Sequence, residues 1–254
     1  MSEGHDGRMT DARPAGSYGT DAPWVPWLWF GIAALQVVFL VLSVAGGGGP
    51  FVLLPLVLAL VFAAGGGLYV HATARGKFDV WAGLLDALPA SSRRAVLDLG
   101  CGRGAVLIAT ALRAPEARLT GIDLWRSIDQ SGNDPEATRA NATANGVADR
   151  VELVTGDMTA LPFGDGAFDL VTASLSIHNI PSAEGRAEAV REAWRVLAPG
   201  GTLLIVDLPR IREYAAALRG VGATVGDPVS VGWRMWWSGP WVPSLLLRAE
   251  KAPA

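Results

Sequence analysis

A stretch of 53 residues without a charged side chain limits how this chain can fold more than any other feature. Residues 22–74 contain no Asp, Glu, Lys or Arg, although the chain of 254 residues carries 21 basic and 24 acidic side chains. Within it, residues 24–45 and 51–70 are apolar runs of about 20 residues, each able to span the roughly 30 Å hydrocarbon core of a bilayer as a helix. Each run contains 12 Leu, Ile, Val or Phe side chains, whose insertion into lipid is favourable by about −4 to −7 kcal/mol per helix. The sequence therefore predicts a transmembrane helical hairpin over residues 23–71.

The charges around this hairpin predict its orientation. Arg8 and Arg13 precede it and Arg75 and Lys77 follow it, whereas the turn between the two runs is uncharged. Because positively charged flanks stay in the cytoplasm, we expect an integral membrane protein whose two termini and remaining domain are cytoplasmic. The alternative is a hairpin buried inside a larger soluble core. Residues 1–22, rich in Gly, Ser, Thr, Asp and Ala, are expected to form a disordered tail.

Residues 72–254 alternate between the patterns of strands and helices. Short apolar runs predict strands at residues 95–99, 118–123, 151–155, 167–174 and 202–208. Helical spacing of apolar residues predicts helices at 78–88, 105–112, 135–145, 183–197 and 211–219. Segments 223–231 and 242–249 predict two further strands. This alternation is typical of a doubly wound α/β fold, in which helices cover both faces of a mostly parallel sheet.

The first predicted strand ends in a glycine-rich turn, with glycine at positions 100, 102 and 104 before an Ala-rich helix. Such a turn lets the backbone approach a ligand, and the helix start offers free N–H groups. The turn also fits the dinucleotide fingerprint, with Asp123 where the ribose-binding acid would lie. Asp98 distinguishes the two cofactors, because a negative charge there would repel a diphosphate and attract a cationic ligand. A tight turn that binds no ligand is the third alternative.

Residues 98–104, Asp-Leu-Gly-Cys-Gly-Arg-Gly, resemble motif I of the class I S-adenosylmethionine (SAM) methyltransferases, and SAM carries both an amine and a sulfonium cation. Four further segments resemble the same family in the same order: 121–125, 156–163, 168–175 and 195–203. Together the motifs cover residues 95–208, and a dinucleotide oxidoreductase has no reason to show the last three. The resemblance is to the quinone, sterol and small-molecule branch. It implies a Rossmann-like sheet of seven strands, with the last strand antiparallel, and SAM as the cofactor.

The resemblance also implies which residues hold the cofactor. These are Asp98, Gly100, Cys101, Gly102, Gly104, Asp123, Leu124, Asp157, Met158 and Ser174. Asp123 would accept hydrogen bonds from the two ribose hydroxyls and Asp157 from the exocyclic amine of adenine. Met158 would pack against the adenine ring.

Three segments are candidates for the site of the methyl acceptor. His178 follows the fourth predicted strand, and histidine is the type of side chain best suited to removing a proton near neutral pH. Asn179 beside it could orient a polar acceptor; the alternative is a loop histidine that only orders its turn. Asp129 lies in a long polar link beside the cofactor and could contact the acceptor. Four of the ten tryptophans lie within residues 233–241, and they could line the pocket, insert into the membrane surface or pack in the core; three of them, Trp233, Trp236 and Trp237, are candidate acceptor contacts.

Composition excludes several functions. Beyond the hairpin the domain holds 19 basic and 20 acidic residues, so it lacks the basic surface that nucleic-acid binding requires. Cys101 is the only cysteine, which excludes a disulfide framework, a cysteine metal site and methyltransferases of the arsenite type; we expect no metal. We therefore expect a membrane-anchored SAM-dependent methyltransferase whose partner is a lipophilic or membrane-associated small molecule. The alternatives are a methyltransferase of a small thiol or amine, a membrane-bound NAD-dependent oxidoreductase, and a non-catalytic SAM-binding protein.

Overall fold

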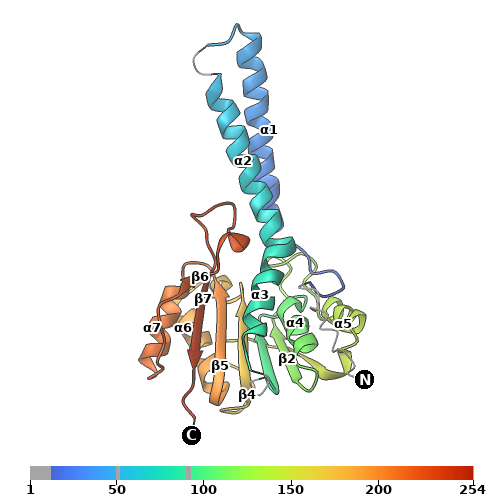
Figure 1. The fold of residues 1–254 in the computed structure, drawn as a ribbon, viewed down its shortest axis with the longest axis vertical. Coiled ribbons are helices and arrows are strands. Elements are labelled where there is room, and N and C mark those ends of the chain that lie inside the picture. Colours follow the sequence, from blue (N-terminus) through green and yellow to red (C-terminus); the bar gives the residue numbers. More distant parts are fainter. Residues whose placement is uncertain (1–12, 50–51, 90–92, 254) are drawn as a thin grey trace, which may run out of the picture.

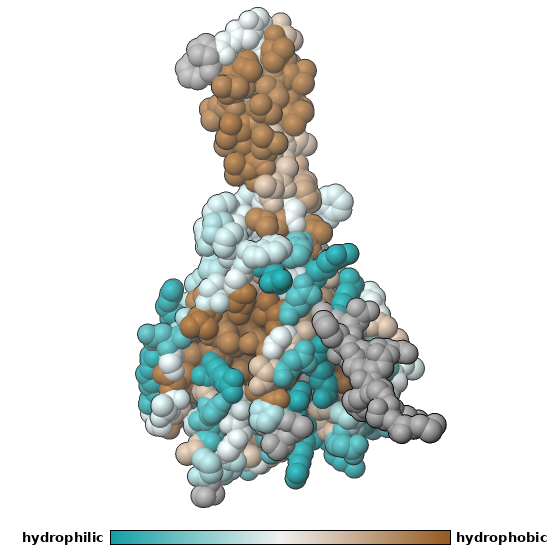
Figure 2. Space-filling model, viewed as in Figure 1, coloured by the Kyte–Doolittle hydropathy of each residue, from teal (hydrophilic) through white to brown (hydrophobic). Residues whose placement is uncertain are grey.

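The two apolar runs form a helical hairpin that stands on one end of an α/β domain (Figure 1). This arrangement comes from a computed structural model, which describes residues 13–49, 52–89 and 93–253. Helices α1 (Trp24–Ala45) and α2 (Leu53–His71) pack against each other, and the rings of Trp29 and Phe62 lie 5.2 Å apart between them. Most of their other large side chains face outward, so the hairpin presents a nearly continuous apolar surface (Figure 2). Within the described chain, the hairpin is therefore not buried in a soluble core.

Helix α2 does not end where the apolar run ends. It continues through one π-helical turn, η1 (Ala72–Gly76), into α3 (Lys77–Asp86). The helix expected at 78–88 is thus the lower part of a single rod that begins in the hairpin. Charged residues such as Arg75 favour water over lipid, but they do not interrupt the backbone hydrogen bonds of a helix. The helix therefore continues past the point where the apolar run ends.

The domain contains the expected seven-stranded sheet, in the order β3-β2-β1-β4-β5-β7-β6. Its strands are β1 (Ala95–Leu99), β2 (Arg118–Asp123), β3 (Val151–Thr155), β4 (Phe168–Ser174), β5 (Leu197–Asp207), β6 (Val229–Ser230) and β7 (Leu245–Glu250). The pairs from β3 to β5 are parallel, and β7 is antiparallel to both of its neighbours. The strand expected at 223–231 is reduced to two residues, and β5 begins before the expected residue 202 because Leu197 already pairs with Phe168.

Alternation along the strands divides the apolar interior into two cores, one on each face of the sheet. Val96 belongs to the core under α3 and α4, whereas Leu97 and Leu99 belong to the core under α6 and α7. This follows from the two-residue period of a strand, which points successive side chains to opposite faces. The helices that follow α3 are α4 (Ala105–Arg113), α5 (Pro135–Ala144), α6 (Ala183–Val196) and α7 (Ile211–Gly220), with short turns η3 (Ala148–Arg150), η4 (Ile177–Asn179) and η5 (Trp233–Met235).

The parallel strands all end on the side of the sheet that faces the hairpin. Strand β7 runs in the opposite direction to β5 and leads to the C-terminus, which lies at the end of the domain away from the hairpin (Figure 1). Open α/β sheets bind ligands at the carboxyl ends of their parallel strands. The topology therefore places the expected ligand edge directly under the hairpin.

Residues 13–22 differ from the expected disordered tail. Tyr18 is only 2% exposed, and Asn141 of α5 accepts a hydrogen bond from the backbone N–H of Ser17 and donates one to its carbonyl. Asn145 makes the same pair of bonds with Ala15. Small side chains leave the backbone of this segment accessible. The amide side chains of Asn141 and Asn145 then hydrogen-bond to its N–H and C=O groups, as a neighbouring strand would. Residues 1–12 of the expected tail lie outside the described chain.

Candidate functional site

A pocket opens at the carboxyl ends of β1, β2 and β4, as the topology predicts. Nine of the ten expected cofactor residues line it: Asp98, Gly100, Cys101, Gly102, Asp123, Leu124, Asp157, Met158 and Ser174. The tenth, Gly104, does not. Gly104 has a φ of +80° at the start of α4, and a Cβ on it would lie 2.9 Å from the Thr138 side chain. Its role is therefore to shape the turn and to let α5 pack closely.

The glycine turn depends on backbone angles that other residues rarely adopt. Gly100 and Gly102 have φ values of +63° and +50°. A Cβ on Gly100 would lie 2.3 Å from the Cβ of Ser176, so only glycine lets β1 and the end of β4 meet at the pocket. Cys101 between them is buried, and burial raises the pKa of its thiol, so the side chain stays protonated and unreactive.

Asp98 lies at the floor of the pocket and is almost completely buried. It is 2% exposed, and the Thr172 hydroxyl donates a hydrogen bond of 2.7 Å to its Oδ1. Burial raises the pKa of Asp98 to about 7, against the smaller opposing effect of the Thr172 bond. The expectation of a fixed negative charge at neutral pH is thus corrected: without a ligand, the carboxyl group titrates near neutrality. A cation beside it would favour the charged form.

This titration predicts a pH-dependent affinity for SAM. Protonated Asp98 is neutral and cannot attract a cation, so the affinity should fall as pH drops below about 7, by up to about tenfold per pH unit. Calorimetric titration with SAM between pH 5.5 and 8.5 measures it. The same series on Asp98→Asn isolates the residue, because that variant should bind weakly with little dependence on pH. If the affinity of Asp98→Asn for SAM still depended on pH as in the wild type, the pH dependence would belong to another group.

Asp123 organises the turn as well as facing the pocket. Its Oδ2 accepts a hydrogen bond of 2.8 Å from the N–H of Gly102, and its Oδ1 accepts from the N–H of Trp125 (2.6 Å) and from Nδ2 of Asn133 (3.2 Å). A carboxylate has about four acceptor positions, so these three donors leave it little capacity to receive both ribose hydroxyls alone. Asp123 therefore uses most of its acceptor positions for contacts within the protein, and few remain for the ribose hydroxyls.

Asn133 supplies the missing acceptor. It is 8% exposed and lines the pocket, and its Oδ1 is buried without a hydrogen-bond partner among the described residues. The orientation of the amide follows from chemistry, since only Nδ2 can donate to the Asp123 carboxylate. A buried acceptor without a donor is costly, and a ligand hydroxyl or amine would satisfy it. No sequence motif distinguishes Asn133, which stands in the polar link before α5.

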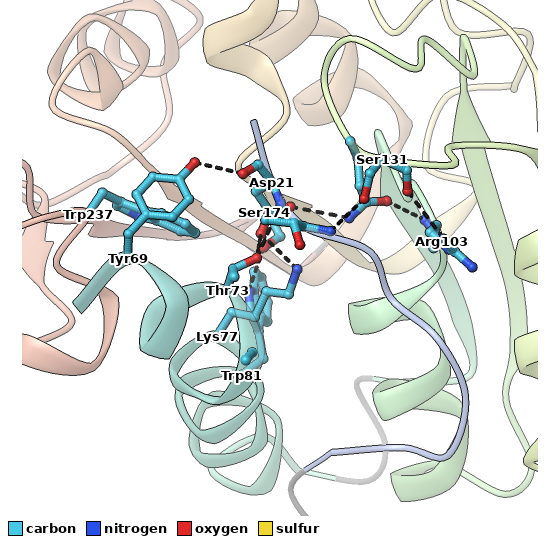
Figure 3. Close-up of polar contacts among 12 residues, drawn as sticks. Asp21, Tyr69, Thr73, Lys77, Trp81, Arg103, Ser131, Ser174 and Trp237 are labelled. Carbon is cyan, nitrogen blue, oxygen red and sulfur yellow. Dashed lines mark hydrogen bonds and ion pairs between the residues drawn. The ribbon is translucent and has the colours of Figure 1, made fainter. Parts of the chain in front are cut away.

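The base of the hairpin forms one wall of the pocket (Figure 3). Asp21, just before α1, accepts hydrogen bonds at Oδ2 from the Thr73 hydroxyl (2.7 Å) and from Nζ of Lys77 (2.8 Å). Its Oδ1 accepts from Nε2 of Gln130 (3.2 Å), whose Oε1 in turn accepts from the backbone N–H of Arg103 in the glycine turn (2.9 Å). A continuous chain of hydrogen bonds thus joins the hairpin to the cofactor turn. The sequence shows Asp21 and Lys77 only as charges that flank the apolar region.

Ser174 and Asp157 take up different positions at the rim. Ser174 accepts a 2.8 Å hydrogen bond from the indole N–H of Trp81 in α3, which is fully buried (Figure 3). Asp157 is exposed, and its Oδ1 accepts a bond from the N–H of Thr159 two residues later. Ser174 is therefore held by the core, whereas Asp157 is held only by its own turn.

Only some of the candidate acceptor residues line the pocket. Asn179 and Asp129 line the pocket, as expected. Burial raises the pKa of Asp129, while the charges of Arg126 and His178 act against this rise. His178 itself lies at the rim rather than in the lining. Its Nδ1 is 2.5 Å from Oδ1 of Asp207 at the end of β5, a partner that sequence analysis did not identify.

None of the three candidate tryptophans is among the residues that line the pocket, and their expected role as acceptor contacts stays a prediction. Trp237 is buried, its ring packs edge-on against Tyr69 at 5.0 Å, and its indole N–H donates to Ser244. Trp233 is half exposed and stacks on His71 at 4.9 Å, and Trp236 is not in the lining either. Residues 233–241 pack on the hairpin base because η1 carries a glycine at the point of contact.

That glycine is Gly76. A Cβ on it would lie only 1.7 Å from the carbonyl oxygen of Arg234, so no other residue would let η5 approach the rod so closely. The ring contacts of Trp237 with Tyr69 and of Trp233 with His71 also join this segment to α2, and an ion pair of 3.8 Å joins Arg234 to Asp79 of α3. No residue of 233–241 lines the pocket.

The charges that line the pocket favour a cationic ligand over a diphosphate. Among the residues that the structure describes, two cationic side chains line it, Lys77 and Arg126. Five carboxyl groups from the same described residues line it: Asp21, Asp98, Asp123, Asp129 and Asp157. Lys77 is already neutralised by its contact with Asp21. With the unpartnered oxygen of Asn133, this set fits a cationic nucleoside such as SAM.

Residues 97–205 match the protein family described as methyltransferase domain. The chain is 34% identical over 132 residues to the ubiquinone/menaquinone biosynthesis C-methyltransferase UbiE of Roseobacter denitrificans, covering 52% of this chain and 49% of that protein. It is 33% identical over 118 residues to the sterol 4-C-methyltransferase strm-1 of Caenorhabditis elegans, covering 46% of this chain and 32% of that protein. The chain thus spans about half the length of the first of these relatives and a third of the second.

Solved structures share the fold. A geranyl diphosphate C-methyltransferase from Streptomyces coelicolor A3(2) superposes with a TM-score of 0.56 at 18% identity, over 72% of this chain and 81% of that chain. The [4+2]-cyclase SpnF superposes with a TM-score of 0.53 at 20% identity, over 68% and 82%. At these identities only the architecture is shared, and a cyclase on the same architecture shows that fold alone does not decide the chemistry.

Proposed function

We propose that this chain, which contains a SAM-dependent methyltransferase domain, is a membrane-anchored enzyme that transfers a methyl group to a lipophilic small molecule. One observation carries the membrane part of this proposal: Asp21 and Lys77, at the two ends of the hairpin, line the pocket. An acceptor dissolved in a bilayer around the hairpin would meet the domain at the edge where the pocket opens. A soluble acceptor would gain nothing from this placement.

The residues of the pocket support SAM as the cofactor. The family match of residues 97–205 decides between the two cofactors that fit the glycine turn. When bound, SAM supplies a methyl group on a sulfonium sulfur, which departs as a neutral thioether. Asp98 would face a cationic group, Asp123 and the free oxygen of Asn133 would accept from the ribose hydroxyls, and Met158 would lie against the base. Holding the reactants in line and excluding water supply most of the rate in such a transfer.

Two features support a lipophilic acceptor. The relatives named above are C-methyltransferases of ubiquinone/menaquinone biosynthesis and of a sterol, and both names refer to lipophilic compounds. The second feature is a belt of exposed tryptophans around the hairpin base, made of Trp24, Trp27, Trp233 and Trp241. In the space-filling view, pale surface of intermediate hydropathy lies between the apolar hairpin and the domain, whose surface is mixed polar and apolar (Figure 2). Exposed Trp side chains at such a boundary are typical of a membrane interface.

His178 is the proposed general base and Asn179 a proposed contact of the acceptor. Asn179 lines the pocket, and His178 precedes it in η4, directly after the strand that ends at Ser174. An imidazole is the side chain best matched to proton removal near neutral pH. The proposed acceptor is therefore one that must lose a proton.

The proposed orientation places the domain in the cytoplasm, and it can be read by cysteine labelling. Cys101 is buried, so its background labelling should be low. A membrane-impermeant maleimide should label Gly49→Cys, in the hairpin turn, on intact spheroplasts of a bacterial host. Gly164→Cys, in the domain, should be labelled only after lysis; neither added Cβ meets an atom within 4 Å. Labelling of Gly164→Cys on intact spheroplasts would reverse the orientation.

Transfer of labelled methyl groups tests the function itself. The full chain in lipid nanodiscs is incubated with methyl-labelled SAM and either an organic extract or an aqueous extract of host membranes and cytosol. We expect label in the organic-soluble product, and far less with the Asp123→Ala variant at a SAM concentration near the wild-type Kd. Label confined to water-soluble thiols or amines would support the alternative acceptor class. SAM binding without transfer to either extract would support a non-catalytic protein.

A further inference from the structure

The carboxyl group of Asp207 accepts four hydrogen bonds from described residues. Its Oδ1 accepts from Nδ1 of His178 (2.5 Å) and from the N–H of Leu208 (2.8 Å), and its Oδ2 accepts from the N–H of His178 and the hydroxyl of Tyr214, both at 3.1 Å. These donors come from η4, the end of β5 and α7. Asp207 is 0% exposed. The carboxyl group is therefore rigidly held at the point where three elements meet.

These contacts decide which nitrogen of His178 carries its proton. A carboxylate only accepts hydrogen bonds, so Nδ1 must donate to Asp207. In the neutral ring, Nε2 then has a free lone pair, and it has no hydrogen-bond partner among the described residues. The two backbone N–H groups and the Tyr214 hydroxyl would be enough to order the loop. The imidazole contact is additional, and it is the one that sets the tautomer.

His178 lies close to the pocket. His178 is 24% exposed, and the two residues that follow it, Asn179 and Ile180, line the pocket. Asp129, which lines the pocket from the β2–α5 link, is near enough for the charge of His178 to act on its carboxyl group. A basic nitrogen at this rim can reach a group held in the pocket without competing for cofactor contacts.

We propose that Asp207 is a positioning residue that holds His178 in the tautomer able to accept a proton from the methyl acceptor at Nε2. This rests on the proposed methyltransferase function and extends it to the acceptor class: a molecule whose nucleophilic atom carries an acidic hydrogen, such as a hydroxyl group. The bond from that atom to hydrogen breaks, and its electron pair bonds to the methyl carbon. The carbon–sulfur electron pair stays on the sulfur, and the proton goes to Nε2. The imidazolium so formed lies against the buried carboxylate.

The tautomer is measured directly by ¹⁵N NMR of the histidine rings in the full chain in nanodiscs. The chain has only three histidines, and His178→Gln identifies the signals of His178. At a pH where the ring is neutral, we expect Nδ1 to be protonated and Nε2 to be a free acceptor. A wild-type spectrum with the proton on Nε2 overturns the proposal, and this measurement needs no variant of Asp207 to fold.

Variants separate positioning from a purely structural role. Asp207→Asn can place an N–H toward the ring, so the other tautomer should rise. We expect kcat to fall by at least about tenfold, the lower limit seen when a carboxylate that orients a metal-bound histidine is lost. KM and the Kd for SAM should change little. Tyr214→Phe is the matched control, because it removes a donor to the same carboxyl group but keeps the imidazole contact; its tautomer should be that of the wild type.

The outcomes are distinct. A lower kcat in Asp207→Asn with the wild-type tautomer would make the role structural and overturn the proposal. If the wild-type protein binds SAM but transfers methyl groups to no acceptor, the proposed function fails. In that case the tautomer still supports or overturns the positioning of His178 by Asp207.

Discussion

His178→Gln is expected to lower kcat by about 10²- to 10⁴-fold, the usual contribution of a positioned general base. Glutamine keeps a polar side chain of similar length but cannot take a proton near neutral pH. The Kd for SAM should stay within about twofold of the wild type, because His178 lies at the rim and not in the lining of the pocket. Turnover is measured by methyl-label transfer at saturating SAM, and the Kd by calorimetry.

The matched control for this variant is His71→Gln. His71 is the last residue of α2 and stacks on Trp233 outside the pocket, so the same substitution there should leave turnover essentially unchanged. Wild-type turnover in His178→Gln would remove it as the base. The acceptor class would then extend to nucleophiles that need not lose a proton, such as a tertiary amine.

Asp123→Ala is expected to weaken cofactor binding by about 2–4 kcal/mol, or roughly 30- to 1000-fold in Kd, as the loss of charge-assisted hydrogen bonds in a partly buried site does. The effect has two sources. The variant removes an acceptor that faces the pocket, and it leaves the N–H groups of Gly102 and Trp125 and the amide of Asn133 without their common partner. Calorimetry with S-adenosylhomocysteine on the solubilised protein measures the loss.

Asp157→Ala is the comparison that makes this result specific. Asp123 is the last residue of β2 and Asp157 lies two residues beyond β3; both line the pocket, but Asp157 is exposed and caps only its own turn. Its removal should cost less than about 1 kcal/mol, as for other exposed polar contacts. Equal losses in the two variants would mean that pocket charge, rather than the hydrogen bonds of Asp123, controls affinity.

The contrast between Asp98 and Asp123 shows how far a motif can be interpreted. Both were expected as carboxylates at strand ends, and both line the pocket. The motif does not show that burial raises the pKa of Asp98 to about 7. Nor does it show that three backbone and side-chain donors already occupy Asp123. Residue type and spacing indicate the chemistry that is available, whereas charge state and free hydrogen-bonding capacity depend on neighbours from other elements.

The sequence by itself determined the two apolar helices, the positions of most strands and helices, the seven-stranded sheet and the glycine turn with residues that line the pocket beside it. These features depend on patterns within a few residues: apolar run length, the periods of 2 and 3.6, and turn residues. Only the tertiary structure decided that His178 meets Asp207, 29 residues away, and that Asp21 meets Thr73, 52 residues away. It also placed the tryptophan segment on the hairpin base. Such contacts follow from strand register and helix orientation, which arise when distant segments pack and have no periodic trace in the chain.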